Sequence, residues 1–316
     1  MIEWKSESAV LPLVGIARRS PASGQYFEQW LCANKYDIQQ RLMSHGAILF
    51  RGFQVTSPEL FQNIAAIFCS ELGDYIGGNS PRTKVAGNVF TSTEYPKSER
   101  ISMHNEGSYL RRMPRYILFC CVTPAAEGGQ TPIADCRRVL NRIDTSVRTR
   151  FERSGIRYVN NLHAGAGLGK SWMDAYQTRS RAEVEARLEE DGHTWKWRSN
   201  GSLQIHMNAP ATARHPITQE EVWINQAEQW HPSSLNAEFR EKLLSIIKED
   251  DLPHHAYLGD GSPLTPFDLA NIREAMTGEE RVFKWQVGDV LLCDNLLIMH
   301  GRQPYSGDRK ILAAMG

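Results

Sequence analysis

The chain has 316 residues and carries 36 Lys plus Arg against 36 Asp plus Glu, so its formal net charge is zero. This balance provides no overall field to attract nucleic acid or an anionic membrane surface, and it favours a small or locally charged substrate. The N-terminus lacks the basic and then apolar layout of a signal peptide. No apolar stretch is long enough to span a bilayer, so we expect a cytoplasmic protein.

Predicted elements mix α and β in the first third of the chain. Helical periodicity predicts helices over residues 36–44, 58–72 and 135–151, and an apolar run predicts a strand over 47–51. From Tyr116 onward, apolar and aromatic runs predict strands over 116–122, 156–160, 193–197, 203–207, 282–285, 290–293 and 310–314. Helices that are polar on one side are predicted between them over 181–190, 234–248 and 266–277.

These elements predict a mainly β core with helical decoration. The candidate metal ligands described below come from both ends of the β region, so one closed barrel or roll over residues 1–316 is favoured over two domains. The cysteines form no Cys-x-x-Cys pair and several lie in apolar runs, which predicts reduced and mostly buried thiols. They are Cys32, Cys69, Cys120, Cys121, Cys136 and Cys293.

A histidine and a carboxylate lie two positions apart at His104 and Glu106, a spacing found at only one of the ten histidines. In an extended segment residues i and i+2 point the same way and can bind one ion together. His300 follows the turn and buried strand predicted over 288–295. Two imidazoles and one carboxylate, with open coordination positions, are typical of a non-haem Fe(II) site that binds O2. The alternatives are a surface His-Glu pair and an ordinary core histidine.

Two further side chains could bind a dicarboxylate near this ion. Arg309 follows His300 by nine residues and opens the last predicted strand, where its guanidinium offers a bidentate donor. Its neighbour Lys310 is the alternative cation. Thr131, in the loop Glu127-Gly-Gly-Gln-Thr-Pro132, offers a hydroxyl donor. Taken alone, Arg309 would be interpreted as a solvated surface residue and Thr131 as part of an ordinary loop.

The chain resembles the TauD/TfdA group of Fe(II)/2-oxoglutarate-dependent dioxygenases, especially its syringomycin-biosynthesis-like and clavaminate-synthase-like branch. The motifs that carry the resemblance are HGAILFRGF (45–53), SPR (80–82), FTSTEYP (90–96), HNEGSY (104–109), GGQTP (128–132), VWIN (222–225), GDVLLCDN (288–295) and HGRQPYSGDR (300–309). It implies a double-stranded β-helix (jelly roll), with iron on His104, Glu106 and His300. It also implies that Arg309 and Thr131 hold the distal carboxylate of 2-oxoglutarate.

The resemblance implies an O2-dependent hydroxylation that releases succinate and CO2. The implied substrate is an amino acid, or an aminoacyl group on a carrier protein, in natural-product biosynthesis. Glu106 fills the position that halogenating relatives leave to chloride, which argues against chlorination. Desaturation, cyclisation and epimerisation remain open. Many relatives have a second arginine four residues beyond the cosubstrate arginine, and this chain has Ala313 there.

Substrate contacts are the least specific part of the prediction, and a structural role is the alternative for each. The candidates are Ser80, Arg82, Asn88, Ser108 and Tyr109, with Trp223, Asn225 and Arg302 on the opposite side. We expect Trp172, Trp195 and Trp197, like Trp223, to be core residues. A zinc hydrolase or isomerase would use the same three ligands but leave Arg309 and Thr131 without a role. A binding or scaffold protein of the same fold would not consume 2-oxoglutarate.

Overall fold

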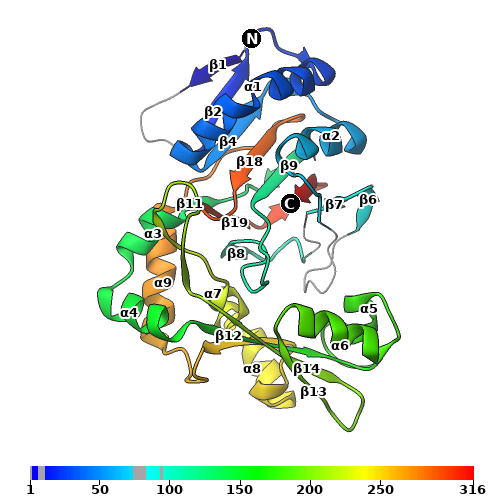
Figure 1. The fold of residues 1–316 in the computed structure, drawn as a ribbon, viewed down its shortest axis with the longest axis vertical. Helices are drawn as coiled ribbons and strands as arrows, with labels where there is room; N and C mark the ends of the chain where they lie inside the picture. Colours follow the sequence, from blue (N-terminus) through cyan, green and yellow to red (C-terminus); the bar gives the residue numbers. More distant parts are fainter. Residues whose placement is uncertain (1, 6–10, 74–82, 93–94) are drawn as a thin grey trace.

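A computed structural model describes residues 2–5, 11–73, 83–92 and 95–316 of the chain. Its centre is an eight-stranded sheet in which neighbouring strands are antiparallel, apart from the parallel pair β2 and β4 (Figure 1). The strands in spatial order are β1 (Ile2–Lys5), β2 (Leu13–Ala17), β4 (Ala47–Arg51), β18 (Val290–Asp294), β9 (Tyr116–Thr123), β21 (Lys310–Met315), β7 (Val89–Thr91) and β6 (Lys84–Ala86).

The middle strands of this sheet are mostly apolar, which suits strands that are buried on both faces. Successive side chains alternate between two clusters: Leu118 and Cys120 of β9 pack with α1 and α2, whereas Ile117 and Phe119 face the rest of the molecule. Helix α1 (Gly24–His45) begins at the Ser23 cap, and α2 (Pro58–Phe68) begins at the Ser57 cap. The caps set where the two helices begin, and the apolar faces of the helices explain why both pack on the same face of the sheet.

A smaller sheet lies on the face of the large sheet that is opposite to α1 and α2, and it carries the two candidate histidine ligands, His104 and His300. It consists of β11 (Ile133–Asp135), β19 (Ile298–Arg302) and β8 (Ile101–His104), with the pair β10 (Glu127–Gly128) and β20 (Tyr305–Ser306) close by in sequence. Figure 1 shows β8 and β19 beneath the central strands β9 and β18. Two sheets packed face to face in this way form a jelly-roll core. The predicted fold class, mainly β with helical decoration, is therefore confirmed.

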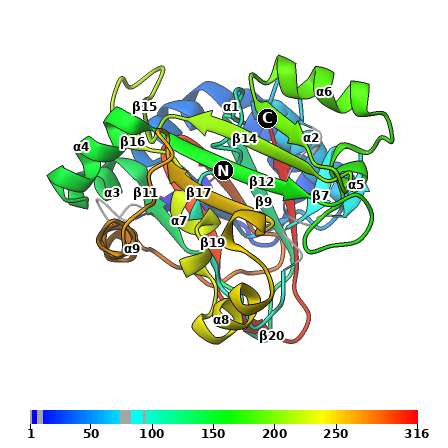
Figure 2. The ribbon, with the colours of Figure 1, turned by 90° about the horizontal axis from the view of Figure 1, so that it is seen from below.

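A third sheet and most helices surround this core. Its strands in spatial order are β13 (Thr194–Trp197), β14 (Leu203–Ala209), β12 (Ile156–Leu162) and β17 (His254–Leu258). Figure 2 shows β14, β12 and β17 side by side. The helices are α3 (Cys136–Arg142), α4 (Thr145–Ser154), α5 (Trp172–Tyr176), α6 (Arg181–Glu190), α7 (Ala227–Trp230), α8 (Ala237–Ile246) and α9 (Pro266–Glu279), with the 3-10 turns η1 (Pro232–Ser234) and η2 (Glu249–Asp251). Short pairs join β15 (Thr212–Arg214) to β16 (Glu221–Trp223) and β3 (Ala22–Ser23) to β5 (Phe53–Gln54).

Two predicted elements were wrong. The strand predicted over 282–285 is absent: this segment has no strand partner, and Trp285 turns into the core. The helix predicted over 135–151 is two helices, because the Asp144 side chain accepts the Ser146 N–H and starts α4 immediately after α3 ends. Within the described ranges, every helix is too short or too polar to cross a bilayer.

Candidate metal centre

The structure brings His104, Glu106 and His300 together. His104 ends β8 and faces His300 of β19 as its direct register partner, so the two imidazoles lie on the same face of the small sheet. Their ring centroids are 4.7 Å apart, and His104 Nε2 lies 3.9 Å from Glu106 Oε2. One ligand atom from each residue lies within 4.8 Å of the other two. All three side chains are buried.

Glu106 reaches this cluster by a different route from the one expected. Strand β8 ends at His104, and Glu106 lies in the following turn, where Gly107 adopts a φ of +66°. That left-handed conformation favours glycine. The expectation that Glu106 belongs to an extended segment was therefore wrong, and the turn, rather than strand alternation, directs its carboxylate.

The proton on His104 is fixed by a backbone carbonyl. His104 Nδ1 lies 2.8 Å from the Ser102 carbonyl oxygen, which can only accept, so Nδ1 carries the proton and Nε2 keeps its lone pair. The Ser102 carbonyl is thus the hydrogen-bond partner of Nδ1, and Gln229 Nε2, on α7, lies 3.2 Å away. Metal-binding histidines characteristically have an outer partner of this kind on the second ring nitrogen.

Asn295 holds the backbone of Glu106 from both sides. The Glu106 N–H donates to Asn295 Oδ1 at 2.9 Å, and Asn295 Nδ2 donates to the Glu106 and Pro114 carbonyls, each at 2.9 Å. Asn295 is fully buried. The adjacent Asn105 is held in turn by the Asn295 carbonyl at 2.7 Å and by the Gln226 amide at 2.7 Å. Buried amides therefore fix the turn that presents the carboxylate.

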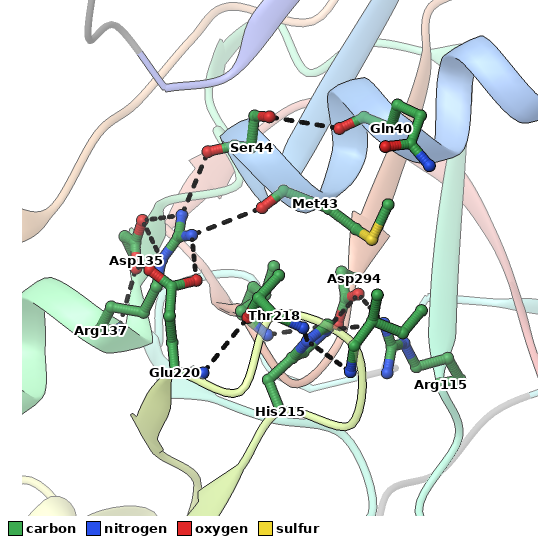
Figure 3. A network of polar contacts seen from close by, with 12 residues as sticks. Gln40, Met43, Ser44, Arg115, Asp135, Arg137, His215, Thr218, Glu220 and Asp294 are labelled. Carbon is green, nitrogen blue, oxygen red and sulfur yellow. Dashed lines mark hydrogen bonds and ion pairs between the residues drawn. The ribbon is translucent and has the colours of Figure 1, made fainter.

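Asp294 fixes the turn that carries Asn295, through the network drawn in Figure 3. Its Oδ2 accepts from Arg115 Nη2 at 2.7 Å and lies 3.1 Å from His215 Nε2. His215 Nδ1 accepts the Thr218 N–H at 2.9 Å, and His215 Nε2 lies 2.6 Å from Arg115 Nη2 as well as beside Asp294. The other oxygen, Oδ1, accepts the Leu296 N–H at 3.0 Å. An ion pair and a turn cap thus hold the residue next to Asn295.

A cavity adjoins the two imidazoles and contains both predicted dicarboxylate-binding side chains. Its walls are formed by Ser92, Ile101, His104, Phe119, Thr131, His300, Gly301, Arg302, Arg309 and Ile311. Arg309 Nε donates to the Gly129 carbonyl at 2.9 Å and Nη1 donates to Ser92 Oγ at 3.2 Å. Burial and the nearby Arg302 guanidinium lower the pKa of Arg309 to about 10, so it stays cationic at neutral pH. Lys310 is exposed and contributes nothing to the walls.

Thr131 is oriented by an indole. Trp285 Nε1 donates to Thr131 Oγ1 at 3.0 Å, and the threonine side chain is buried. Because Oγ1 already accepts this hydrogen bond, its own hydroxyl proton is left to donate to another group. Trp285 therefore belongs to the site, although the sequence placed it in a strand of the core.

The predicted substrate contacts divide into four groups. Ser80 and Arg82 lie outside the described residues. Structural contacts account for Asn88, which donates to the Leu72 carbonyl, for Trp223, which packs on Phe151, and for Asn225, whose side chain accepts the Ala227 N–H. Ser108 and Tyr109 are buried beside the turn that contains Glu106.

Among the candidates that the structure describes, Arg302 alone lines the cavity, and it donates to the carbonyls of Tyr95, Pro96 and Glu99 at 2.6–2.9 Å. Ala313 is buried in the face of β21 that packs with the inner core. The remaining expected core tryptophans differ in burial: Trp172 is buried, whereas Trp195 and Trp197 are half-buried.

Comparison with known proteins agrees with this geometry. Residues 10–315 match the taurine catabolism dioxygenase TauD, TfdA family. The chain belongs to this family. The dapdiamide synthesis protein DdaC of Enterobacter agglomerans is 38% identical over 89% of this TauD/TfdA chain and 84% of its own length. A clavaminate synthase-like protein of Arabidopsis thaliana is 30% identical over 92% and 87% of the two chains.

Solved structures share the fold at low identity. PvcB from Pseudomonas aeruginosa matches with a TM-score of 0.54 at 18% identity, covering 96% of this chain and 84% of that one. AAD-2, solved with Mn(II) and N-oxalylglycine, matches with a TM-score of 0.52 at 13% identity, covering 100% and 96% of the two chains.

The protein is thus a TauD/TfdA dioxygenase, and Fe(II) and 2-oxoglutarate are its cofactor and cosubstrate. The donor set fits this ion, since two imidazoles and one carboxylate bring their ligand atoms within 4.8 Å of one another. The cavity fits the cosubstrate because the half-buried Arg309 guanidinium and the Thr131 hydroxyl line it next to the imidazoles.

Proposed function

We propose that His104, Glu106 and His300 bind Fe(II), and that Arg309 and Thr131 bind the distal carboxylate of 2-oxoglutarate. The observation that supports this proposal is the single cavity that joins the imidazoles to Arg309 and Thr131. We further propose that the enzyme hydroxylates an unactivated carbon of an amino acid, or of an aminoacyl group on a carrier protein, in natural-product biosynthesis. The name of the relative DdaC supports a biosynthetic role.

The bound iron supplies the redox chemistry that couples decarboxylation of 2-oxoglutarate by O2 to oxidation of the substrate. The protein supplies orientation. Arg309 neutralises and aligns the distal carboxylate by bidentate pairing, with Thr131 as a third donor. The Ser102 carbonyl and the Asn295 amide keep His104 and Glu106 in position. Phe119 and Ile311 form apolar walls that limit water in the cavity.

Glu106 also bears on the type of product. Its carboxylate lies beside the two histidines and would take the coordination position that a halide needs. We therefore propose hydroxylation rather than chlorination. Turnover of wild-type protein and of Glu106→Ala in chloride tests this point: a chlorinated product from the wild-type protein would contradict it.

The first experiment is an anaerobic titration of metal-free protein with Fe(II) and 2-oxoglutarate. We expect the visible charge-transfer band of a chelated keto acid in the wild-type protein and its loss in His104→Ala and His300→Ala. Arg309→Ala should bind 2-oxoglutarate about 30- to 150-fold more weakly, which corresponds to a loss of about 2–3 kcal/mol for charge-assisted hydrogen bonds. Lys310→Ala is the matched control and should bind normally, because Lys310 is exposed.

Absence of the charge-transfer band in folded, iron-loaded protein would reject the proposal that this cavity binds 2-oxoglutarate at the iron. Unchanged affinity in Arg309→Ala, with weaker binding in Lys310→Ala, would transfer the cosubstrate role to Lys310. Substrate class is tested separately by measuring succinate release with free amino acids and with aminoacyl carrier proteins. A product heavier by one oxygen supports hydroxylation, whereas a product lighter by two hydrogens indicates desaturation.

A further inference from the structure

A second group of potential ligands lies away from the cavity. Among the residues that the structure describes, His231, Glu249 and His255 are the other group whose ligand atoms lie within 4.8 Å of one another. They come from three separate segments: His231 lies between α7 and η1, Glu249 opens η2, and His255 lies in β17. We propose that these three side chains form a second metal site, which binds Zn²⁺ or a similar divalent ion.

The His255 ring is held in the orientation that a metal ligand requires. Its Nδ1 lies 2.9 Å from the Ala256 carbonyl, which can only accept, so Nδ1 carries a proton and Nε2 faces away from that carbonyl. Nε2 lies 2.8 Å from Glu249 Oε1. The ring also stacks on Tyr257, with 4.2 Å between centroids and 10° between planes. A carbonyl on Nδ1 is the usual outer partner of a metal-binding histidine, and a cation shared by Nε2 and Glu249 would replace the hydrogen bond that now joins them.

His231 contacts Ser233 through the hydroxyl and the backbone N–H of that serine. Its Nδ1 lies 2.8 Å from Ser233 Oγ, and this hydroxyl accepts from Arg273 Nη2 at 2.6 Å. The Ser233 N–H lies 3.1 Å from the same nitrogen, an arrangement that suits Nδ1 as an acceptor. Coordination through Nε2 moves the proton to Nδ1, where Ser233 Oγ can accept it. Metal binding is therefore expected to change the tautomer of His231, which provides a signature independent of activity.

The surroundings of the cluster suit a hydrated ion with access to solvent. His255 is 3% exposed and its ring centroid lies 5.0 Å from that of His231, whereas the Glu249 side chain is 56% exposed. The ion would thus contact one buried imidazole, one half-buried imidazole and one carboxylate at the surface, with water completing the coordination. Two nitrogens and one oxygen favour Zn²⁺ over the oxygen-seeking Mg²⁺ and Ca²⁺.

The site would join segments that otherwise meet only through side-chain packing and hydrogen bonds. An ion shared by His231, Glu249 and His255 ties η2 and β17 to the end of α7. The end of α7 is already joined to η1 by a hydrogen bond from Ser234 Oγ to the Gln229 carbonyl at 2.9 Å, and the ion would add η2 and β17 to this connection. We therefore infer a structural ion that stabilises this corner of the molecule, rather than a second catalytic centre.

The test counts Co²⁺ equivalents by visible absorption and equilibrium dialysis in metal-free protein. We expect two equivalents in the wild type, one in His104→Ala/His300→Ala, one in His255→Ala and none in the triple variant. If the cavity site binds no metal, the wild type and His104→Ala/His300→Ala each bind one equivalent and His255→Ala binds none. Failure of the proposed iron site can therefore be distinguished from failure of the second site. His206→Ala, a half-buried histidine of β14 outside both clusters, is the control and should match the wild type.

Glu249→Gln guards against misfolding, because this side chain is exposed and its replacement leaves the core intact. In the His104→Ala/His300→Ala background it should weaken Zn²⁺ binding by at least about tenfold. In the same background, Zn²⁺ should shift the ¹⁵N resonances of the His231 ring to those of an Nδ1-protonated tautomer. The proposal is overturned if that background binds no ion, or if Glu249→Gln and His255→Ala leave its affinity unchanged. Either outcome would identify an imidazolium–carboxylate pair only.

Discussion

Replacing Asn295 by alanine tests whether the buried amide, and not the ligands alone, maintains the iron site. The change removes two hydrogen bonds to the Glu106 backbone and one to the Pro114 carbonyl, all at 2.9 Å. Each bond contributes about 1 kcal/mol net, and buried groups left without a partner add about 1–3 kcal/mol. We expect the free energy of unfolding of the metal-free protein to fall by about 3–5 kcal/mol.

The same variant should lose about 10- to 100-fold in Fe(II) affinity, which is the usual effect of removing an outer partner of a metal ligand. Urea unfolding of metal-free protein measures the first quantity, and Fe(II) titration with saturating 2-oxoglutarate measures the second. Asn161→Ala is the matched control: Asn161 donates to the Asp250 and Leu252 carbonyls at 3.0 and 2.7 Å, in another sheet. It should reduce stability without changing iron affinity. Equal iron affinity in Asn295→Ala and wild type would refute the reasoning.

Three other predictions follow from described contacts. Trp285→Phe removes the indole donor to Thr131, about 1 kcal/mol, and should raise the KM for 2-oxoglutarate about fivefold with little change in kcat; an unchanged KM would contradict the role given to Trp285. Arg51→Met leaves the fully buried Asp289 carboxylate unpaired and should cost about 3–5 kcal/mol in urea unfolding, so a loss below about 1 kcal/mol would argue against the pair. Burial raises the pKa of Cys121 to about 12, so at pH 8 only the exposed Cys32 should react rapidly with a thiol reagent; a second fast thiol would contradict this burial.

The β core was predictable where burial on both faces leaves a continuous apolar run. Strands β9, β18 and β21 occur at the predicted places because their side chains pack against α1 and α2 on one face and the inner core on the other. The segment 282–285 has a similar composition but serves a different purpose, since its Trp285 reaches Thr131 instead of pairing with a strand. Composition alone does not distinguish these two uses of a short apolar run.

The candidate site was predictable in its ligand types but not in its supports. His104, Glu106 and His300 have a side-chain chemistry and spacing that indicate a metal site, and the structure brings them together. Asn295 and Gln229 carry no such indication, because an amide acquires its role only from contacts formed in the fold. The contact between Asn295 and Glu106 spans 189 positions. The one available signal was the position of Asn295 at the end of a buried strand, and it did not specify a partner.

The order of strands in the large sheet bears on how the chain reaches its folded state. Strand β18 lies between β4 and β9, and β21 lies between β9 and β7, although both come near the end of this sequence. Until they insert, β4 and β9 each present an unpaired apolar edge, and such edges promote association between chains. Contacts so distant in sequence also slow folding. Newly made protein is therefore expected to pass through an aggregation-prone stage that ends when β18 and β21 fill the gaps.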